Sequence, residues 1–581
     1  MADWKSLPAE VRIMILDRIV WSGAADGNIT GYATVSREWQ AYFEPLNFRR
    51  LVLNHSRVAD FGKLTRNRKW MVKHIWLRVE LPRYHCPRSG HIETPDQTQR
   101  NNQIFTQALW QLLKVLGSWG NSKAYDPVDG TGPVLELSAH SPSDMKHRFD
   151  ACAMDKDVYP HISDENCTDE EFSNHIRREL RKDGNRGHHC QAASHPDGTV
   201  AHLCMFQYIQ LDFSAIKNLR VKKLPRVDTI KGLILRRQHY RRFSARTVAE
   251  IARSFQTIGN VIYEPIFVEP RSADRIHPQT FEQEYRDLIR ETHRFNGFSI
   301  FMGYYAYRGV AVVPIWKLSD SFSLMLADES HSLEHLSQAF VGDALMFFQD
   351  FLQPGSLKYQ SYLDSSRAAV QKALLAHLSA IGKHVPSNRR RSPEEFEQAL
   401  LKAAGYEDGL IPRSIYKPQW PKLKTLALTS RFHLVADPNR KGMDIFEAAG
   451  FAALEMPELQ TMEIWSSRCH DFFRYCRNDE KGGGRPTITL GSHNNVAFEP
   501  RVSIVWDRVA RKHSNHGITA KTQILRRIMA YPTEYPYQEI DNLELREKIV
   551  HPISLCEFRW FNEGWEKTEG RKTFRFLPWP L

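Results

Sequence analysis

The residues most able to do chemistry in this sequence are histidines and cysteines between positions 152 and 204. Zinc favours Cys and His in tight pairs such as C-x2–4-C and H-x3–5-H. The nearest approximations, Cys190 with His195 and His202 with Cys204, complete no zinc-binding spacing. We therefore interpret the stretch as a solvated loop and predict no metal site. Its cysteines and histidines are Cys152, His161, Cys167, His175, His188, His189, Cys190, His195, His202 and Cys204.

Motifs of catalysis and nucleotide binding are missing from the sequence. There is no G-x-x-x-x-G-K-S/T, no G-x-G-x-x-G, no G-x-S-x-G and no H-E-x-x-H. His433 with Asp437, or His470 with Asp471, supplies a base and an acid, but nothing places a nucleophile beside either pair. We therefore predict no catalytic residue, no cofactor and no enzymatic activity.

Basic residues concentrate in one segment. The chain carries 79 Lys and Arg against 67 Asp and Glu, a net charge of +12. Between Lys217 and Arg246 there are eleven basic residues against Asp228 alone, and Tyr240 and Phe243 lie among them. Such a patch could follow a phosphate backbone with aromatic rings stacked on bases, or face an acidic protein partner, or simply be solvated. The candidate binding residues are Lys222, Lys223, Arg236, Arg237, Arg241 and Arg242.

The composition is that of a folded protein. Hydrophobic residues make up 42% of the 581 residues and charged residues 25%. The eight cysteines form no C-x-x-C pair and no dense framework, the start of the chain has no basic segment before an apolar one, and no apolar stretch is long enough to span a bilayer. We expect an intracellular protein, cytoplasmic or nuclear or both, without a membrane partner.

One apolar string recurs along the chain and indicates the elements that position these residues. It has the form apolar-x-x-apolar-x-apolar, the strand signature of leucine-rich repeats, and helical patterns follow at 245–255 and 445–454. This favours an α/β fold in which an irregular leucine-rich-repeat-like solenoid of parallel strands carries long insertions; an ordinary α/β domain is the alternative. The strings begin at Phe48, Val72, Ile230, Leu423 and Leu459.

Composition shifts divide the chain further. We predict a helical module at 1–48, a repeat region at 49–380 with a polar insertion near 140–200, a linker at 381–395 and a C-terminal repeat-like domain at 396–581. Within the last of these, a glycine-rich loop at 482–484 precedes a strand at 487–490.

Residues 4–48 form the most specific pattern. Val11, Ile15 and Ile19 recur at a spacing of four after Leu7-Pro8, and a second short helix, ended by Pro45 and Asn47, carries Val35, Trp39 and Phe43 at the same spacing. Leu7-Pro8-Ala9-Glu10-Val11, followed by Val35-Ser36-Arg37-Glu38-Trp39, closely resembles an F-box.

The resemblance implies a function. F-box proteins are substrate receptors of cullin–RING ubiquitin ligases: the F-box binds a Skp-type adaptor, and the rest of the chain holds the target protein. It implies that Leu7 and Pro8 insert into the adaptor and that further apolar residues line or support the interface, with Trp39 equally able to be core. The alternative is that these helices only cap the first repeat. The supporting residues are Leu16, Ile19, Val35 and Trp39.

A second resemblance covers the far end of the chain. The blocks at 420–430, 448–465, 473–475 and 550–555 look like the C-terminal region of a filamentous-fungal group of F-box proteins, in which this region has no assigned function. We therefore expect a non-catalytic substrate-recognition subunit that joins an unknown substrate protein to a Skp-type adaptor and a cullin ligase. A repeat-based interaction scaffold without a ligase role, or a nucleic-acid binder through 217–246, are the alternatives.

Overall fold

The structure is a computed structural model. It describes residues 4–23, 29–84, 93–120, 132–144, 207–216, 222–237, 241–256, 258–267, 285–304, 320–352, 418–430, 434–435, 441–466, 471–478, 484–493, 496–525, 540 and 542–555. The polar insertion predicted near 140–200 lies almost wholly outside these residues.

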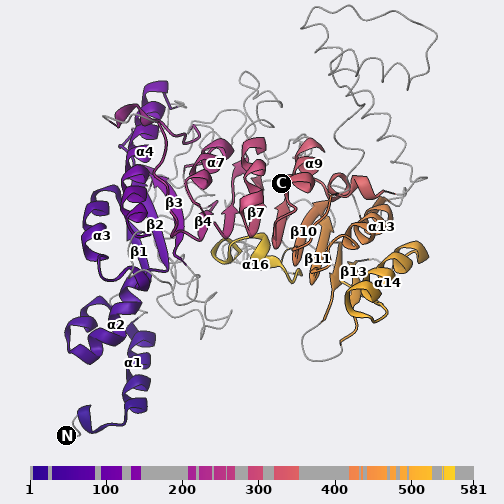
Figure 1. The fold of residues 1–581 in the computed structure, drawn as a ribbon, viewed down its shortest axis with the longest axis horizontal. Coiled ribbons are helices and arrows are strands. Elements are labelled where there is room, and N and C mark those ends of the chain that lie inside the picture. The colour runs from indigo at the N-terminus through magenta and orange to yellow at the C-terminus, as the bar shows by residue number, and fades with distance from the viewer. Residues whose placement is uncertain are drawn as a thin grey trace, which may run out of the picture.

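A twelve-stranded sheet runs through the described part of the chain (Figure 1). Its strands follow one another in chain order, so that each strand pairs with the one before it. The short strands β6 (Ile266–Phe267) and β8 (Gly303–Tyr304) form a separate pair. The strands of the main sheet are β1 (Arg50–Leu53), β2 (His74–Glu80), β3 (Val134–His140), β4 (Gly232–Leu235), β5 (Asn260–Tyr263), β7 (Gly297–Phe301), β9 (His335–Ala339), β10 (Thr425–Ser430), β11 (Thr461–Ser466), β12 (Phe472–Cys476), β13 (Thr487–Ser492) and β14 (Thr519–Ile524).

Only β12 runs against the other strands of the main sheet. From β1 to β11 every pairing is parallel. Strand β12 is antiparallel to both of its neighbours, and β14 is again parallel to β13. Parallel neighbours need a crossover connection, and the strand order here never reverses, so the crossovers between β1 and β11 need only one face of the sheet.

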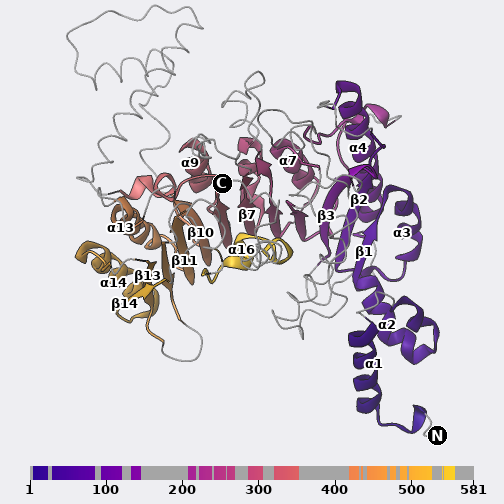
Figure 2. The same cartoon turned by 180° about the vertical axis from the view of Figure 1, so that it is seen from behind.

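The helices line that face. Figures 1 and 2 show α7, α9 and α13 along one side of the row of strands and the short helix α16 on the opposite side. We call the face away from α7, α9 and α13 the helix-free face. The helices of the described residues include α1 (Ala9–Gly23), α2 (Arg37–Arg49), α3 (Val58–Leu64), α4 (Pro95–Gly117), α7 (Ala245–Arg253), α9 (Asp320–Glu329), α10 (Ala344–Phe347), α13 (Lys441–Ala453), α14 (Pro500–Ser514) and α16 (Arg546–Ile549).

Alternating side chains assign each strand to the two faces. In β3, Leu135, Leu137 and Ala139 are buried in the main core, whereas Glu136 and Ser138 point to the helix-free face. Polar groups are thus buried on the helix-free face, where they need partners.

All five apolar strings predicted from the sequence contain strands, namely β1, β2, β4, β10 and β11, and β13 lies at the predicted 487–490. Helices α7 and α13 confirm the helical patterns at 245–255 and 445–454. The expectation of parallel strands is wrong for β12, whose hairpin partners are β11 and β13. The fold is a mixed α/β fold with N-terminal helices.

The predicted end of the second N-terminal helix is also wrong. Helix α2 begins after Ser36, whose hydroxyl accepts a hydrogen bond from the Trp39 N–H over 3.2 Å, and it continues through Pro45 to Arg49. A proline removes one hydrogen bond of the helix but does not always end it. The helix therefore leads directly into β1.

The predicted linker 381–395 lies outside the described residues, and the domain boundaries stay predictions. On either side of that linker, β9 and β10 pair in parallel, with Thr425 opposite His335 and Leu428 opposite Gln338. The sheet is thus continuous between the two regions that the sequence separates.

Candidate functional site

The N-terminal module, residues 4–48, has a small core of its own. Leu16, Val20, Ile29 and Phe43 are buried together, apart from the main core. The Trp39 ring packs on this core, with its centroid 5.6 Å from that of Phe43. The module is therefore a separately packed unit at the β1 end of the sheet (Figure 1).

Further contacts tie the first residues of the module to α2. The indole N–H of Trp4 donates to Glu38 over 2.8 Å, and Arg12 forms an ion pair with the same carboxylate over 2.9 Å. The Trp4 and Trp39 rings lie 5.7 Å apart. Glu38 thus joins the start of α2 to α1 and to the turn before it.

The six predicted adaptor-binding residues do not share one surface. Pro8 and Val35 are exposed, and Leu7 is half-buried. Ile19 and Trp39 are partly buried against the small core. Their roles in binding stay predictions.

Leu16, which was expected to line or to support an interface, lies inside the module. It is 1% exposed, because it fills the core between α1 and α2. Its place in the structure is a support for the module, and it offers no surface to a partner.

The sequence prediction named Val35 among the adaptor-binding residues but not Val11, Ile13 or Met14, whose apolar side chains are also exposed. Met14 is 68% exposed, Ile13 50% and Val11 38%, and Val35 at the start of α2 is 59% exposed. Four of the eight large apolar side chains exposed among the described residues thus lie within 25 positions of one another. We call these four residues the N-terminal apolar surface. Exposed apolar groups that form a contiguous patch are typical of interaction sites, and Val11 and Met14, three positions apart in α1, lie on one side of that helix.

Three of the six residues of the predicted basic patch, Arg236, Arg237 and Arg241, are buried. Arg236 lies on the helix-free face, where it binds Glu136 of the adjacent β3 with an Nη2–Oε1 distance of 2.6 Å. The backbone N–H of Arg237 donates to Glu264, which follows β5, over 3.2 Å. The Arg236 side chain and the Arg237 backbone are thus bonded to buried carboxylates inside the fold.

The other predicted basic residues divide between core and surface. Arg241 is buried beside Glu93, at 3.3 Å, and Asp144, at 3.6 Å. Arg242 lies over the Tyr208 ring, 4.5 Å from its centroid. The remaining two, Lys222 and Lys223, are exposed.

A C-terminal segment crosses the helix-free face. We call residues 542–555, which include α16, the C-terminal strap. It begins beside β11 and β12, passes β9 and β7, and ends at Glu264 after β5, so it runs against the order of the strands. In Figures 1 and 2, α16 lies beside the middle strands, far from β14, which precedes it in the chain.

The first attachment of the strap is Glu463 of β11. This buried carboxylate accepts hydrogen bonds from the backbone N–H groups of Glu544 and Leu545, each over 2.9 Å. Arg474 of β12 donates its Nε to the same carboxylate over 2.6 Å and its Nη2 to the Asn542 carbonyl over 2.5 Å. Burial raises the pKa of Glu463, and these donors oppose that shift.

The second attachment is Glu264. Its carboxylate accepts the His551 N–H over 2.6 Å and the Ser554 hydroxyl over 2.6 Å. Between the two attachments, the Ser299 hydroxyl of β7 donates to the Ile549 carbonyl over 3.0 Å. The apolar residues of the strap are buried: Leu543, Leu545, Ile549, Val550, Ile553 and Leu555.

These contacts make the strap part of the fold. Six buried apolar side chains and two carboxylate attachments bind it, and each such side chain contributes on the order of 1.5–3 kcal/mol on burial. The helix-free face between β5 and β12 is therefore covered by the chain itself. This removes that area as an open binding surface.

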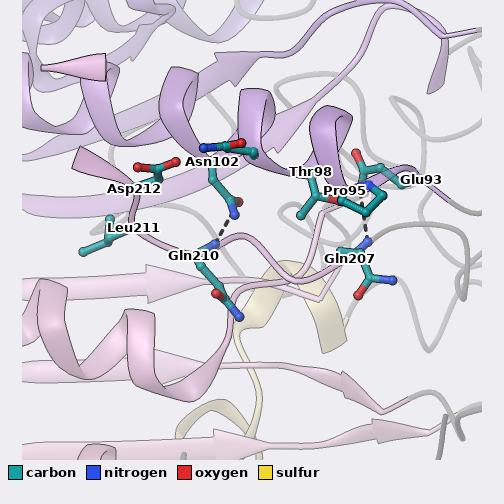
Figure 3. A pocket seen from close by; sticks show the side chains of 9 residues that line it. Glu93, Pro95, Thr98, Asn102, Gln207, Gln210, Leu211 and Asp212 are labelled. Carbon is teal, nitrogen blue, oxygen red and sulfur yellow. Dashed lines mark hydrogen bonds between the residues drawn. The ribbon is translucent and has the colours of Figure 1, made fainter. Parts of the chain in front are cut away.

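A polar cavity of about 480 Å³ lies at the start of α4 (Figure 3). Glu93 and Asn102 on the α4 side accept the backbone N–H groups of Gln207 and Gln210, each over 3.0 Å. The lining side chains carry two carboxylates and no basic group: Glu93, Pro95, Thr98, Gln99, Asn102, Gln207, Gln210, Leu211 and Asp212. Two of the lining side chains, Glu93 and Asn102, are thus already bonded within the protein.

The Cys- and His-bearing stretch 152–204 lies outside the described residues, as do His433, Asp437 and His470. Within the described ranges, no group of three or more His, Cys, Asp or Glu is arranged to hold a metal ion. No helix among those ranges is long and apolar enough to cross a membrane.

Comparison with known families gives one match. Residues 279–551 match a family of unknown function, DUF6546, and no F-box family is matched. The match runs from before β7 to His551 in the C-terminal strap, and it covers most of the blocks that resemble an unassigned C-terminal domain. No curated protein and no solved structure is found to be similar to the chain.

Proposed function

We propose that the chain is the substrate-recognition subunit of a Skp–cullin–F-box-type ubiquitin ligase, a non-catalytic subunit that links a target protein to the ligase. The observation that carries the proposal is the N-terminal apolar surface on a separately packed helical module. A helix that presents apolar side chains to a groove is a common mode of protein recognition.

The order of the strands supports the finer architecture that this proposal includes. Strands that follow one another in chain order, parallel from β1 to β11 with helices on one face, are what a leucine-rich-repeat-like solenoid needs. In this proposal the N-terminal module, at the β1 end, binds a Skp-type adaptor, and the sheet region recognises the substrate.

The test is co-purification of the full chain with a Skp-type adaptor. Met14→Glu puts a charge where an apolar side chain would be buried by the partner, and we expect it to weaken adaptor binding at least about tenfold. The double variant Leu7→Ala, Pro8→Ala tests the residues that the F-box resemblance implies. Ile504→Glu is the matched control, because Ile504 on α14, at the other end of the sheet, is 63% exposed and so close to Met14 at 68%.

The outcomes are distinct. Loss of the adaptor with Met14→Glu but not with Ile504→Glu supports the proposal. If the adaptor binds the wild type no better than it binds Met14→Glu and the double variant, the ligase proposal fails, and an interaction scaffold without a ligase role takes its place.

The nucleic-acid alternative loses its main support. Of its six candidate residues, Arg236, Arg237 and Arg241 are buried next to carboxylates. A surface that follows a phosphate backbone needs its cations at the surface. We therefore do not propose nucleic acid as a partner.

A further inference from the structure

Strand β14 ends the sheet at the side opposite the N-terminal module, and it is unusually open. Five of its six residues are exposed, and Thr519 is intermediate. Among the described residues no strand pairs with its outer side. Ile524 in particular is 68% exposed.

The backbone pattern identifies which groups point outward. The Thr519 N–H donates to the Pro486 carbonyl over 2.9 Å, and the Leu525 N–H donates to the Ser492 carbonyl over 2.9 Å. In a parallel pair the residues that bond to the neighbour alternate with residues that point away from it. The N–H and C=O groups of the even-numbered residues therefore face outward; these residues are Ala520, Thr522 and Ile524.

Side chains above and below this edge differ in character. Ala520 and Thr522 are in register with Ile488 and Leu490, which are buried in the main core, so the even-numbered side chains of β14 lie on the helix side. Lys521 lies on the helix-free side and is exposed. An incoming strand therefore meets Ile524 on one face and a cation on the other.

The charge around the edge selects the partner. Arg501 and Arg511 of the preceding helix α14 form ion pairs with carboxylates, whereas β14 itself presents the exposed cation Lys521 and no acidic residue. A second copy of the chain would bring another Lys521 opposite or diagonal to the first on the same face, which opposes self-pairing. An acidic strand would instead place its carboxylates beside Lys521.

We propose that the outer edge of β14 binds an extended, acidic segment of a partner protein as an added strand. The backbone groups of Ala520, Thr522 and Ile524 supply the hydrogen bonds, and Lys521 supplies the preference for acidic side chains. The inference goes beyond the adaptor-binding proposal and does not depend on it. Because the C-terminal strap covers the helix-free face between β5 and β12, a partner reaches the sheet more easily at the open edge of β14.

The test uses the full chain and a fluorescein-labelled hexapeptide of alternating valine and glutamate, with a valine–lysine peptide of the same length as comparison. Binding is followed by fluorescence polarisation, and its place by hydrogen exchange of residues 519–524. We expect the acidic peptide to bind at least about tenfold more tightly than the basic one at low salt. We also expect it to slow exchange in β14.

Two variants separate the backbone from the charge. Thr522→Pro removes an outward N–H and leaves the bonds to β13 in place, and an edge strand tolerates it; we expect at least about tenfold weaker binding. Thr522→Ala keeps the N–H and is the matched control, with binding within about twofold of wild type. Lys521→Glu should reverse the preference between the two peptides.

Several results would overturn the inference. They are equal binding of the two peptides, an unchanged affinity in Thr522→Pro with a wild-type circular dichroism spectrum, or a β14-dependent dimer that excludes the peptide. Should Thr522→Pro fail to fold, Lys521→Glu still decides the matter through the peptide preference. Adaptor co-purification is measured in parallel, and all three variants should retain whatever adaptor binding the wild type has.

Discussion

Ser554 donates its hydroxyl group to Glu264 over 2.6 Å, although 290 positions separate the two residues in the chain. Glu264 follows β5, in the middle of the sheet, and Ser554 belongs to the C-terminal strap. The bond lies on the helix-free face, where the strap ends. This hydrogen bond between residues far apart in the chain joins the strap and the sheet into one structure.

The first prediction concerns the attachment of the strap at Glu463. In Glu463→Gln one of the two backbone N–H donors of the strap faces an amide NH₂, and Arg474 loses its carboxylate. We expect the free energy of unfolding to fall by about 1–3 kcal/mol, the cost of unsatisfied buried groups. Urea unfolding followed by tryptophan fluorescence measures it.

Cys476 provides a local readout for the same variant. Its thiol is buried beside Glu544 of the strap, and burial, followed by that carboxylate, raises its pKa well above the ordinary value. Alkylation of Cys476, followed by mass spectrometry, should be slow in the wild type and faster in Glu463→Gln. Equal rates in both proteins would mean that the carboxylate does not fasten the strap.

The second prediction tests the role of Arg236. Because Arg236 is buried against Glu136, Arg236→Ala leaves a buried carboxylate without this partner, and we expect a loss of about 3–5 kcal/mol in stability. Lys222→Glu, at an exposed position, is the control and should change stability by less than about 0.5 kcal/mol. Thermal unfolding distinguishes them. A stable Arg236→Ala protein would return this arginine to the list of candidate binding residues.

The third prediction is a pH dependence at His335. This side chain of β9 is bonded to the Thr425 hydroxyl over 2.9 Å, and burial, followed by Lys548 of the strap and Lys424, lowers its pKa, while Glu334 opposes them. The unfolded chain therefore binds a proton at His335 more readily than the folded chain does. Stability should therefore fall as the pH drops through about 6.5, the ordinary histidine value.

Hydrogen exchange of the strap and urea unfolding between about pH 7 and pH 5.5 check this dependence. His335→Gln keeps a polar side chain without a titrating group, so its stability should vary less over the same interval. If the two proteins lose stability in parallel, His335 is not the group responsible.

The fourth prediction separates a docking module from a cap. Deletion of residues 1–48 removes the small core of the N-terminal module but none of the main core. We expect the remaining chain to stay folded, with a Tm lowered by no more than about 4 °C. Unfolding of the truncated protein at room temperature would favour the view that the helices only cap the first repeat.

The sequence predicted well those elements whose apolar pattern is local. The strings that begin at Val72 and Leu423 lead into β2 and β10, because alternate residues of these strands fill the core on one face of the sheet. For Leu16 the sequence left open whether it lines or supports an interface, because periodicity identifies an apolar face but not which part of it a second helix will cover. The exposure of Met14 follows from the same packing.

The strap and the buried arginines could not be predicted in this way. Arg236 looks like surface charge until the fold brings Glu136, one hundred positions earlier, beside it. Likewise the residues around Ile549 form only a short helix, and their place depends on hydrogen bonds to distant strands. Such pairings depend on three-dimensional neighbours, which local patterns do not encode. Glu136 and Glu463, each within an apolar strand, were the available signals, since a carboxylate buried there needs a partner.

The covering of the helix-free face also sets a constraint on the order of synthesis. Glu264 and Glu463 leave the ribosome long before the residues that donate hydrogen bonds to them, since His551, Ser554, Glu544 and Leu545 come later in the chain. Until the strap has been synthesised, Glu264 and Glu463 lack its hydrogen bonds, and the apolar groups that the strap buries stay exposed. Such surfaces are prone to aggregation and to capture by chaperones. A message cut short before codon 542 would therefore yield a chain that is exposed to quality control from the moment of its release.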